Sequence, residues 1–379
     1  MNYAKRIAKV REIMADRGID VLFLPSCGDR QYLTGLSSER PGPTHHHRSG
    51  DWLDGLFLTG DHALYACPWM IRQGVGEEMS ALPVPGETLI LEEGMDYRAY
   101  AEKIAVHLGL RNPVIGVPKA AAAKSLINLS QAVASATFVN IEAFTCEMRM
   151  RKEPEEIALL RKAAAIADQA FLETVAQIQI GVTELEVAQE LELRMRRLGA
   201  EGLSFSTDVM CKRPGQPFSG GSGLVKLEYG SNVAFDFGCV YQGYCSDTGR
   251  TIYIGEPCDK WRQVHILVMN AQQAALDAIR PGAVTCAELD RIARRVINQG
   301  GYDKEFFHRL GHGIGVDVHE YPYLNKGYDV PLQENMTITV EPSVMVAEEF
   351  RIRVEDVVLV TNKNAEPLNQ VTREMIVID

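Results

Sequence analysis

Apolar positions in the first part of the chain follow helical spacing in some stretches and strand spacing in others. Residues 4–18 carry apolar side chains at helical intervals and end at Gly18, and the apolar run at 20–25 is typical of a buried strand. Runs of both kinds alternate from there on. We predict further strands at 56–58, 63–66, 89–91, 114–117 and 138–141, and helices at 96–109 and 119–135. This alternation predicts an α/β domain.

The rest of the chain contains one series of elements twice. An Ala-rich helix, a turn that leads from glycine to threonine, and a second helix that ends at glycine occupy residues 155–199 and again 261–300. Thr183 and Thr285 are predicted N-caps, each with a glutamate three residues later. Since β structure follows each helix pair, we predict an α+β domain with a pseudo-twofold internal repeat. The predicted parts are an N-terminal domain at 1–145, a connector at 146–160 and a larger domain at 161–379.

Composition excludes several classes of partner. The 379 residues have a formal net charge of −11 and 46% apolar content, so neither a nucleic-acid backbone nor an anionic membrane surface is expected as a partner. Eight cysteines without a CxxC pair favour reduced thiols, as in a cytoplasmic protein. The charged amphipathic N-terminus is unlike a targeting segment, and no apolar run approaches the roughly 20 residues of a membrane span.

Acidic residues recur on the strands that the apolar pattern predicts in the larger domain. If 233–240 and 244–254 pair through a tight turn at Tyr241–Gln242, Asp236 lies directly opposite Asp247. Neighbouring positions are apolar, so water is not expected to screen the two carboxylates. Like charges opposite one another destabilise a pair of strands, and this arrangement requires a positive partner.

A second predicted hairpin has the same construction. Pairing of 337–346 with 350–361 sets Glu341 directly opposite Glu355. Solvent-facing acids on half-exposed strands are the alternative interpretation of each pair. Because the construction occurs twice, we favour a site that holds positive charge between the carboxylates.

His312 completes a candidate metal site. It lies in a glycine-flanked run, residues 311–315. Four carboxylates and one imidazole suit Mn, Fe, Co or Zn and exceed what one divalent ion needs. We therefore expect two divalent metal ions, which in such centres lie about 3.5–4 Å apart and generate a hydroxide near neutral pH.

At these residues the chain resembles the creatinase, prolidase and aminopeptidase P family of metallopeptidases, whose catalytic domain has the pita-bread fold. The matching segments are Tyr32–Gly35, Arg149–Arg161, Asp236–Gly238, Gly243–Thr251, His308–Gly315, Val318–Glu320, Glu341–Pro342 and Arg353–Asp356. The resemblance implies that one metal is bound by Asp236 and Asp247 and the other by His312 and Glu341, with Asp247 and Glu355 as bridges. It also implies that Glu341 takes the proton of the attacking water.

Three further residues have a predicted role beside the metal ligands. His308 and His319 match histidines that line the substrate pocket, where an imidazole can donate to a carbonyl oxygen as charge develops. Arg353 would orient an acidic ligand through a bidentate contact. A histidine satisfied by backbone, and an ordinary surface ion pair, are the alternatives.

The chain departs from the family pattern at three positions. Phe218 stands where family peptidases carry a histidine, and Arg351 and Ser343 stand where glycines are usual. Metal binding is expected to survive these changes, whereas the substrate is open to change.

The leading interpretation is a dimetal hydrolase that cleaves a peptide or amide carbon-nitrogen bond through a metal-bridging hydroxide, as an Xaa-Pro dipeptidase or a similar aminopeptidase. The alternatives are a metal-dependent hydrolase or lyase of a small non-peptide metabolite, and a non-catalytic binding protein on the same fold. The resemblance further implies a homodimer. The adjacent His45, His46 and His47 are interpreted as a solvated loop rather than a metal site.

Overall fold

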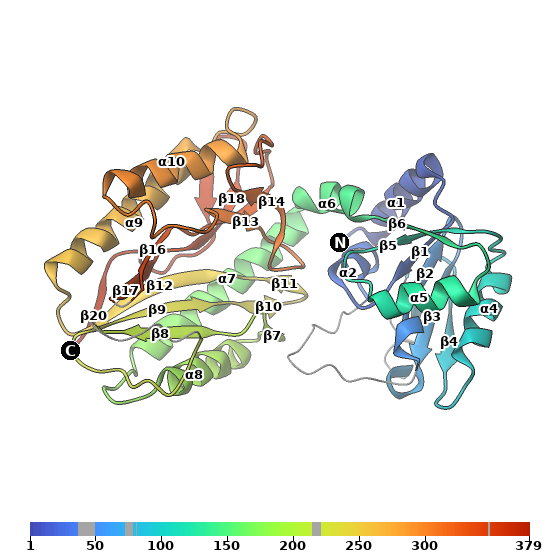
Figure 1. Cartoon of the computed structure of the whole chain (residues 1–379), viewed down its shortest axis with the longest axis horizontal. Coiled ribbons are helices and arrows are strands. Elements are labelled where there is room, and N and C mark those ends of the chain that lie inside the picture. Colours follow the sequence, from blue (N-terminus) through green and yellow to red (C-terminus); the bar gives the residue numbers. More distant parts are fainter. Residues whose placement is uncertain (37–49, 73–78, 81, 214–220, 348) are drawn as a thin grey trace. The chain divides into compact units, whose positions relative to one another are not determined.

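The computed structural model describes residues 1–36, 50–72, 79–80, 82–213, 221–347 and 349–379. The chain forms two compact units, Met1–Met148 and Arg149–Asp379 (Figure 1). The predictions for Phe218 and for His45 to His47 fall outside the described residues.

The first unit is an α/β domain built on one mixed sheet of six strands in the order β4-β3-β2-β1-β5-β6. Its strands are β1 (Val21–Leu24), β2 (Gly55–Thr59), β3 (Ala63–Pro68), β4 (Gly86–Leu91), β5 (Val114–Val117) and β6 (Thr137–Asn140). Its helices are α1 (Tyr3–Arg17), α2 (Gly28–Thr34), α4 (Tyr97–His107), α5 (Ala123–Ala132) and α6 (Glu142–Met150), with 3-10 turns η1 (Asp51–Leu53) and η2 (Trp69–Ile71). β1, β2 and β3 are buried along their whole length, as their unbroken apolar runs predict, and α4 and α5 cover one face of the sheet.

The second unit contains two helix pairs that belong to two cores. The pairs are α7 (Pro154–Val175) with α8 (Glu184–Arg197), and α9 (Asp259–Ala278) with α10 (Cys286–Gln299). Thr183 caps α8 in a full capping box with Glu186, and the Thr285 side chain accepts the Glu288 backbone N-H of α10. Each pair packs its apolar face on its own β structure, so the predicted internal repeat is visible as two similar halves (Figure 1).

The strands of the second unit are short and interrupted. The sheet of the first half has the order β20-β12-β9-β8, and that of the second half has the order β14-β13-β15-β18-β19. A three-stranded sheet β11-β10-β7 and the pair β16-β17 complete the unit. The bounds are β7 (Gly202–Leu203), β8 (Asp208–Lys212), β9 (Ser231–Phe237), β10 (Cys239–Tyr241), β11 (Tyr244–Cys245), β12 (Thr248–Ile254), β13 (Gly311–Gly313), β14 (Glu320–Leu324), β15 (Thr337–Val340), β16 (Ser343–Val346), β17 (Phe350–Arg353), β18 (Asp356–Val360), β19 (Ala365–Pro367) and β20 (Ile376–Ile378).

The predicted register of the first hairpin is wrong. Asp236 pairs with Gly249 rather than with Asp247, because the two-residue turn is made by Gln242 and Gly243 and not by Tyr241 and Gln242. Both turn residues have positive φ, 44° and 78°, as a tight hairpin of the type I′ class requires. The shift moves every cross-strand partner by two positions and keeps the face on which each side chain lies.

The second hairpin has the register that we predicted. Val340 pairs with Asp356 on one side of an interruption, and Ser343 pairs with Arg353 on the other. The same register carried across the interruption sets Glu341 and Glu355 at facing positions. Both hairpins are therefore interrupted, and the acidic residues lie at or next to the interruptions.

Candidate metal centre

The backbone interruptions of the second unit bring the acidic residues together. Asp247 lies between β11 and β12, Glu341 follows β15, and Glu355 precedes β18, while Asp236 is the penultimate residue of β9. At such interruptions the backbone leaves the regular ladder, which allows neighbouring side chains to turn toward one point. His312 lies in the middle of β13.

Gly249 lets the two halves meet at this point. It forms an isolated bridge with Glu355, whose backbone N-H donates to the Gly249 carbonyl at 2.9 Å. A β-carbon at position 249 would lie 2.6 Å from Cδ of Arg353 and 2.7 Å from Oε2 of Glu355. Only glycine leaves room for both side chains to pass over β12 toward Asp236.

The five predicted ligand residues form overlapping groups. The ligand atoms of Asp236, Asp247 and Glu355 lie within 4.8 Å of one another, and so do those of His312, Glu341 and Glu355. Glu355 belongs to both groups. This overlap is the arrangement that a carboxylate shared by two ions requires.

The imidazole of His312 is oriented toward the carboxylates. Nδ1 lies 3.0 Å from the carbonyl oxygen of Gly313, the next residue, so we place the ring N-H on Nδ1. Nε2 is then unprotonated and can bind a metal ion through its lone pair. It lies 3.4 Å from Oδ2 of Asp247 and 3.4 Å from Oε1 of Glu341. The hydroxyl of Thr339 donates to the same Glu341 oxygen at 3.2 Å. Hydrogen bonds of this kind fix the orientation of metal ligands.

The carboxylates carry more negative charge than the site can hold without cations. Burial raises the pKa of Asp247, Glu341 and Glu355, and mutual repulsion among the acids adds to the effect. Oδ1 of Asp247 is buried without a hydrogen-bond partner among the described residues. Buried, crowded carboxylates with an unsatisfied oxygen, beside an imidazole with a free lone pair, fit two divalent ions.

Two arginines supply part of the compensating charge. Nη1 of Arg353 contacts Oδ2 of Asp236 and lies 3.5 Å from Oε2 of Glu355, and its Nη2 lies 3.5 Å from Oε2 of Glu341. Burial alone would lower the pKa of Arg353, but the surrounding acids raise it above its ordinary value. Arg351 is also buried, and its guanidinium contacts Sδ of Met210 at 2.9 Å. Burial and the neighbouring Arg353 lower the pKa of Arg351 to about 10.

A cavity of about 590 Å³ opens over the acids. The candidate ligands, both predicted pocket histidines and Arg353 contribute to its lining, which also includes Phe205, Arg309, Val318 and Asn325. The structure thus brings all eight predicted site residues to one cavity. His319 is exposed at this cavity, and its ring lies 4.1 Å from that of His312, edge to face.

His308 lies in the wall of the cavity with both ring nitrogens engaged. Nδ1 is 2.7 Å from the carbonyl oxygen of Arg309, and Nε2 is 2.5 Å from the hydroxyl of Ser343. Burial lowers the pKa of His308 to about 3, and the neighbouring Arg353 acts in the same direction. A neutral ring that donates from Nδ1 accepts at Nε2, so the Ser343 hydroxyl is the donor.

A buried ion cluster next to His319 was not predicted from the sequence. Glu320 accepts from Lys152 at 2.6 Å and from Arg149 at 2.5 Å, and Arg149 also reaches Asp317 at 2.6 Å. Arg149 and Lys152 lie in the predicted connector, and Glu320 directly follows His319. These ion pairs therefore attach the connector to the segment that holds His319. The charged run 149–152 was interpreted as part of a connector, and burial of its cations has no signal in the sequence.

Comparison with known proteins agrees with this geometry. Residues 158–362 match the model of metallopeptidase family M24, and residues 6–151 match that of the creatinase/prolidase N-terminal domain. The chain belongs to metallopeptidase family M24. This confirms the predicted family, the predicted fold class and the prediction of a metal-dependent hydrolase.

Dipeptidases from several organisms resemble the chain along almost its whole length. An Xaa-Pro dipeptidase from Pyrococcus furiosus is 30% identical, over 98% of this chain and 99% of its own. The crystal structure of a dipeptidase from Pyrococcus horikoshii superimposes with a TM-score of 0.86 at 30% identity, over 98% of this chain and 100% of its own. An Xaa-Pro dipeptidase from Bacillus anthracis gives 0.85 at 29% identity, over 100% of both chains. No helix among the described residues of the chain is long and apolar enough to cross a membrane.

Proposed function

We propose that the protein is a dinuclear metal hydrolase that cleaves the carbon-nitrogen bond of Xaa-Pro dipeptides or similar short peptides. The observation that carries the proposal is the convergence of four carboxylates and one imidazole at one cavity in a chain of family M24. We assign Asp236 and Asp247 to one ion and His312 and Glu341 to the other, with Asp247 and Glu355 shared. When bound, the two ions would supply a Lewis acid for the carbonyl and a water of lowered pKa.

In this proposal Glu341 takes the proton from the attacking water. Burial raises the pKa of this carboxyl group, which makes it a better proton acceptor than a solvated glutamate. The hydroxyl of Thr339 fixes one of its oxygens. The second oxygen faces Nη2 of Arg353, so Arg353 limits how Glu341 can rotate.

We assign His319 to the substrate. Its ring stands edge to face against His312 at the exposed side of the cavity, within reach of a carbonyl held near the acids. An imidazole N-H there stabilises negative charge that develops on the carbonyl oxygen. Glu320, held by Arg149 and Lys152, anchors the chain directly after this histidine.

His308 is assigned to the wall of the same cavity. Its Nε2 is engaged by Ser343, so it would act on substrate only after that hydrogen bond breaks. This observation favours a second candidate function, a hydrolase or lyase of a small non-peptide metabolite. Because His308 is engaged, this wall of the cavity has no free imidazole that could protonate a leaving group. Such a wall suits a substrate whose leaving group needs no proton there.

The test is hydrolysis by metal-reconstituted protein of a panel of Xaa-Pro dipeptides, the same dipeptides without proline, and small amides. The proposal predicts kcat/KM for at least one Xaa-Pro dipeptide in the common enzyme range of about 10⁴–10⁸ M⁻¹s⁻¹. Turnover of small amides alone would replace the peptidase assignment by the second candidate. Loss of all turnover in Asp247→Ala is the control that assigns the activity to this site.

The remaining assignments are proposals of the same kind. We propose Mn, Co, Fe or Zn as the resident metal, because oxygen-rich ligand sets with one nitrogen suit these ions. We also propose a homodimer located in the cytoplasm. Static light scattering and metal analysis of protein purified without added metal test the first two of these points.

A further inference from the structure

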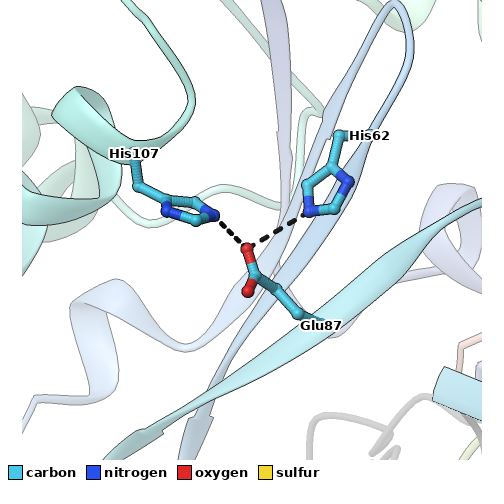
Figure 2. A group of neighbouring side chains, drawn as sticks. All are labelled: His62, Glu87 and His107. Carbon is cyan, nitrogen blue, oxygen red and sulfur yellow. Dashed lines mark hydrogen bonds and ion pairs between the residues drawn. The ribbon is translucent and has the colours of Figure 1, made fainter.

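A second group of metal-binding side chain types lies on the first unit, far along the sequence from the residues of the catalytic centre. His62 lies in the turn before β3, Glu87 lies on β4, and His107 is the last residue of α4 (Figure 2). β4 is an edge strand of the six-stranded sheet. The three side chains therefore join a turn, a sheet edge and a helix end.

The three side chains converge on one point. Nε2 of His62 lies 3.2 Å from Oε1 of Glu87, and Nε2 of His107 contacts the same oxygen (Figure 2). The ring centroids are 6.2 Å apart with planes 59° apart. All three ligand atoms lie within 4.8 Å of one another. Each imidazole thus presents the same type of nitrogen to the shared carboxylate.

The backbone holds these side chains in place. His62 closes a tight turn in which its N-H donates to the Thr59 hydroxyl at 3.0 Å and its carbonyl accepts from the Thr59 N-H at 2.9 Å. β4 pairs with β3 along its whole length, with Glu87 opposite Leu64. α4 is fixed by Ile104 and Ala105, which are buried in the core of the first unit. A site on rigid elements loses little conformational entropy when it binds an ion.

An ordinary ion pair accounts less well for this arrangement. The side chains of His62, Glu87 and His107 are 32%, 43% and 53% exposed, and ion pairs at such exposure contribute little to stability because solvent screens them. Both imidazoles approach the same oxygen of Glu87, so the three ligand atoms point toward one position. An ion bound by two imidazole nitrogens and one carboxylate oxygen satisfies all three groups at once.

We propose that His62, Glu87 and His107 form a mononuclear site for a divalent transition metal of the zinc class, separate from the catalytic centre. Two imidazoles and a carboxylate suit Zn²⁺, Ni²⁺ or Cu²⁺ and disfavour Mg²⁺ and Ca²⁺, which prefer oxygen ligands. Exposure of the three side chains leaves coordination positions for water. A bound ion links the edge strand β4 to the end of α4, so it stabilises the first unit by mass action.

The test counts zinc on the full-length chain after any purification tag has been removed. Asp247→Ala with His312→Ala first disables the catalytic centre. Equilibrium dialysis against low micromolar zinc should leave one equivalent on this background. Adding His62→Gln and His107→Gln should remove it. Equal zinc content with and without the two imidazoles would overturn the proposal.

Two single substitutions that each remove one negative charge distinguish loss of the site from misfolding. On the same background, Glu87→Gln should weaken zinc binding by at least about tenfold, since even partners outside the coordination sphere contribute on that scale. Glu102→Gln removes an exposed acid from the same helix as His107 and should leave the affinity unchanged. Zinc should also raise the melting temperature of the background protein by more than it raises that of Glu87→Gln. An equal affinity loss in both variants, or none in either, contradicts the site.

Discussion

Gly249 lies beneath the side chain of Glu355, so close that a β-carbon at position 249 would be 2.7 Å from Oε2 of that residue. Glu355 belongs to the second half of the second unit, Arg149–Asp379, and Gly249 belongs to the first half of the same unit. The absence of a side chain at one position of β12 is thus what allows both halves to contribute ligands to one centre.

Gly249→Ala is expected to disrupt the centre. The added methyl group must displace Glu355 and Arg353, and overpacking of this kind costs about 1–3 kcal/mol of unfolding free energy. Metal content should fall as well, because Glu355 is a shared ligand in our assignment. Gly202→Ala is the matched control, since a β-carbon there meets no atom within 4 Å. Equal stability and metal content in both variants would argue against this account of Gly249.

Ser343→Gly should release the imidazole of His308. Nε2 then loses its donor and becomes available as an acceptor for a charged donor in the cavity, such as the α-ammonium group of a dipeptide. We expect kcat/KM for Xaa-Pro dipeptides to rise by roughly tenfold, the scale of one hydrogen bond to a charged group. In the double variant with His308→Gln the gain should vanish. A gain that persists without His308 would show that the serine acts by another route.

Removal of the Glu320 carboxylate should destabilise the catalytic unit. Glu320→Gln leaves Arg149 and Lys152 buried without full compensation, which costs about 3–5 kcal/mol of unfolding free energy. Glu366→Gln is the control, because the pair that Glu366 forms with Arg161 is more than 40% exposed on both sides. Chemical denaturation of both variants measures the difference. Comparable small losses would mean that the buried cluster is not structural.

Glu320 also predicts a direction of pH dependence. Burial would raise its pKa, but Lys152 and Arg149 outweigh burial and hold the pKa below the ordinary 4.5. A carboxylate with a lowered pKa stabilises the fold above its unfolded-state pKa, and this contribution is lost as the pH falls through the folded-state value. Wild type should therefore lose stability below about pH 4.5 more steeply than Glu320→Gln does. Parallel profiles would contradict this assignment.

His319→Ala should lower kcat much more than it weakens metal binding. The imidazole acts on charge that is present only in the transition state, and loss of one such donor costs about 10²–10³-fold. Metal titration and steady-state kinetics on the best Xaa-Pro substrate separate the two effects. Unchanged kcat would assign His319 to the structure alone.

The repeat and most elements of the fold could be predicted because they depend on local patterns. The predicted helix at 4–18 is α1 at Tyr3–Arg17, and the predicted strand at 114–117 is β5. α2 was not predicted, because its seven residues are too few to show a helical period.

The register of the first hairpin was wrong for a local reason as well. Gly243 follows Gln242, and a glycine at the second turn position is the signal that would have placed the turn one residue later. The eight candidate site residues could be named because motifs surround them. His62, Glu87 and His107 could not, since they are isolated in the sequence and meet only through pairing of β3 with β4 and packing of α4.

Anomalous diffraction from crystals grown with manganese tests the central claim most directly. Data collected near the manganese edge locate each ion without reference to activity. We predict two peaks among Asp236, Asp247, His312, Glu341 and Glu355, about 3.5–4 Å apart, with Glu355 in contact with both. The crystals are kept at saturating manganese and at a pH at which the carboxylates are deprotonated. A single peak, or no peak, under these conditions would contradict the dinuclear assignment.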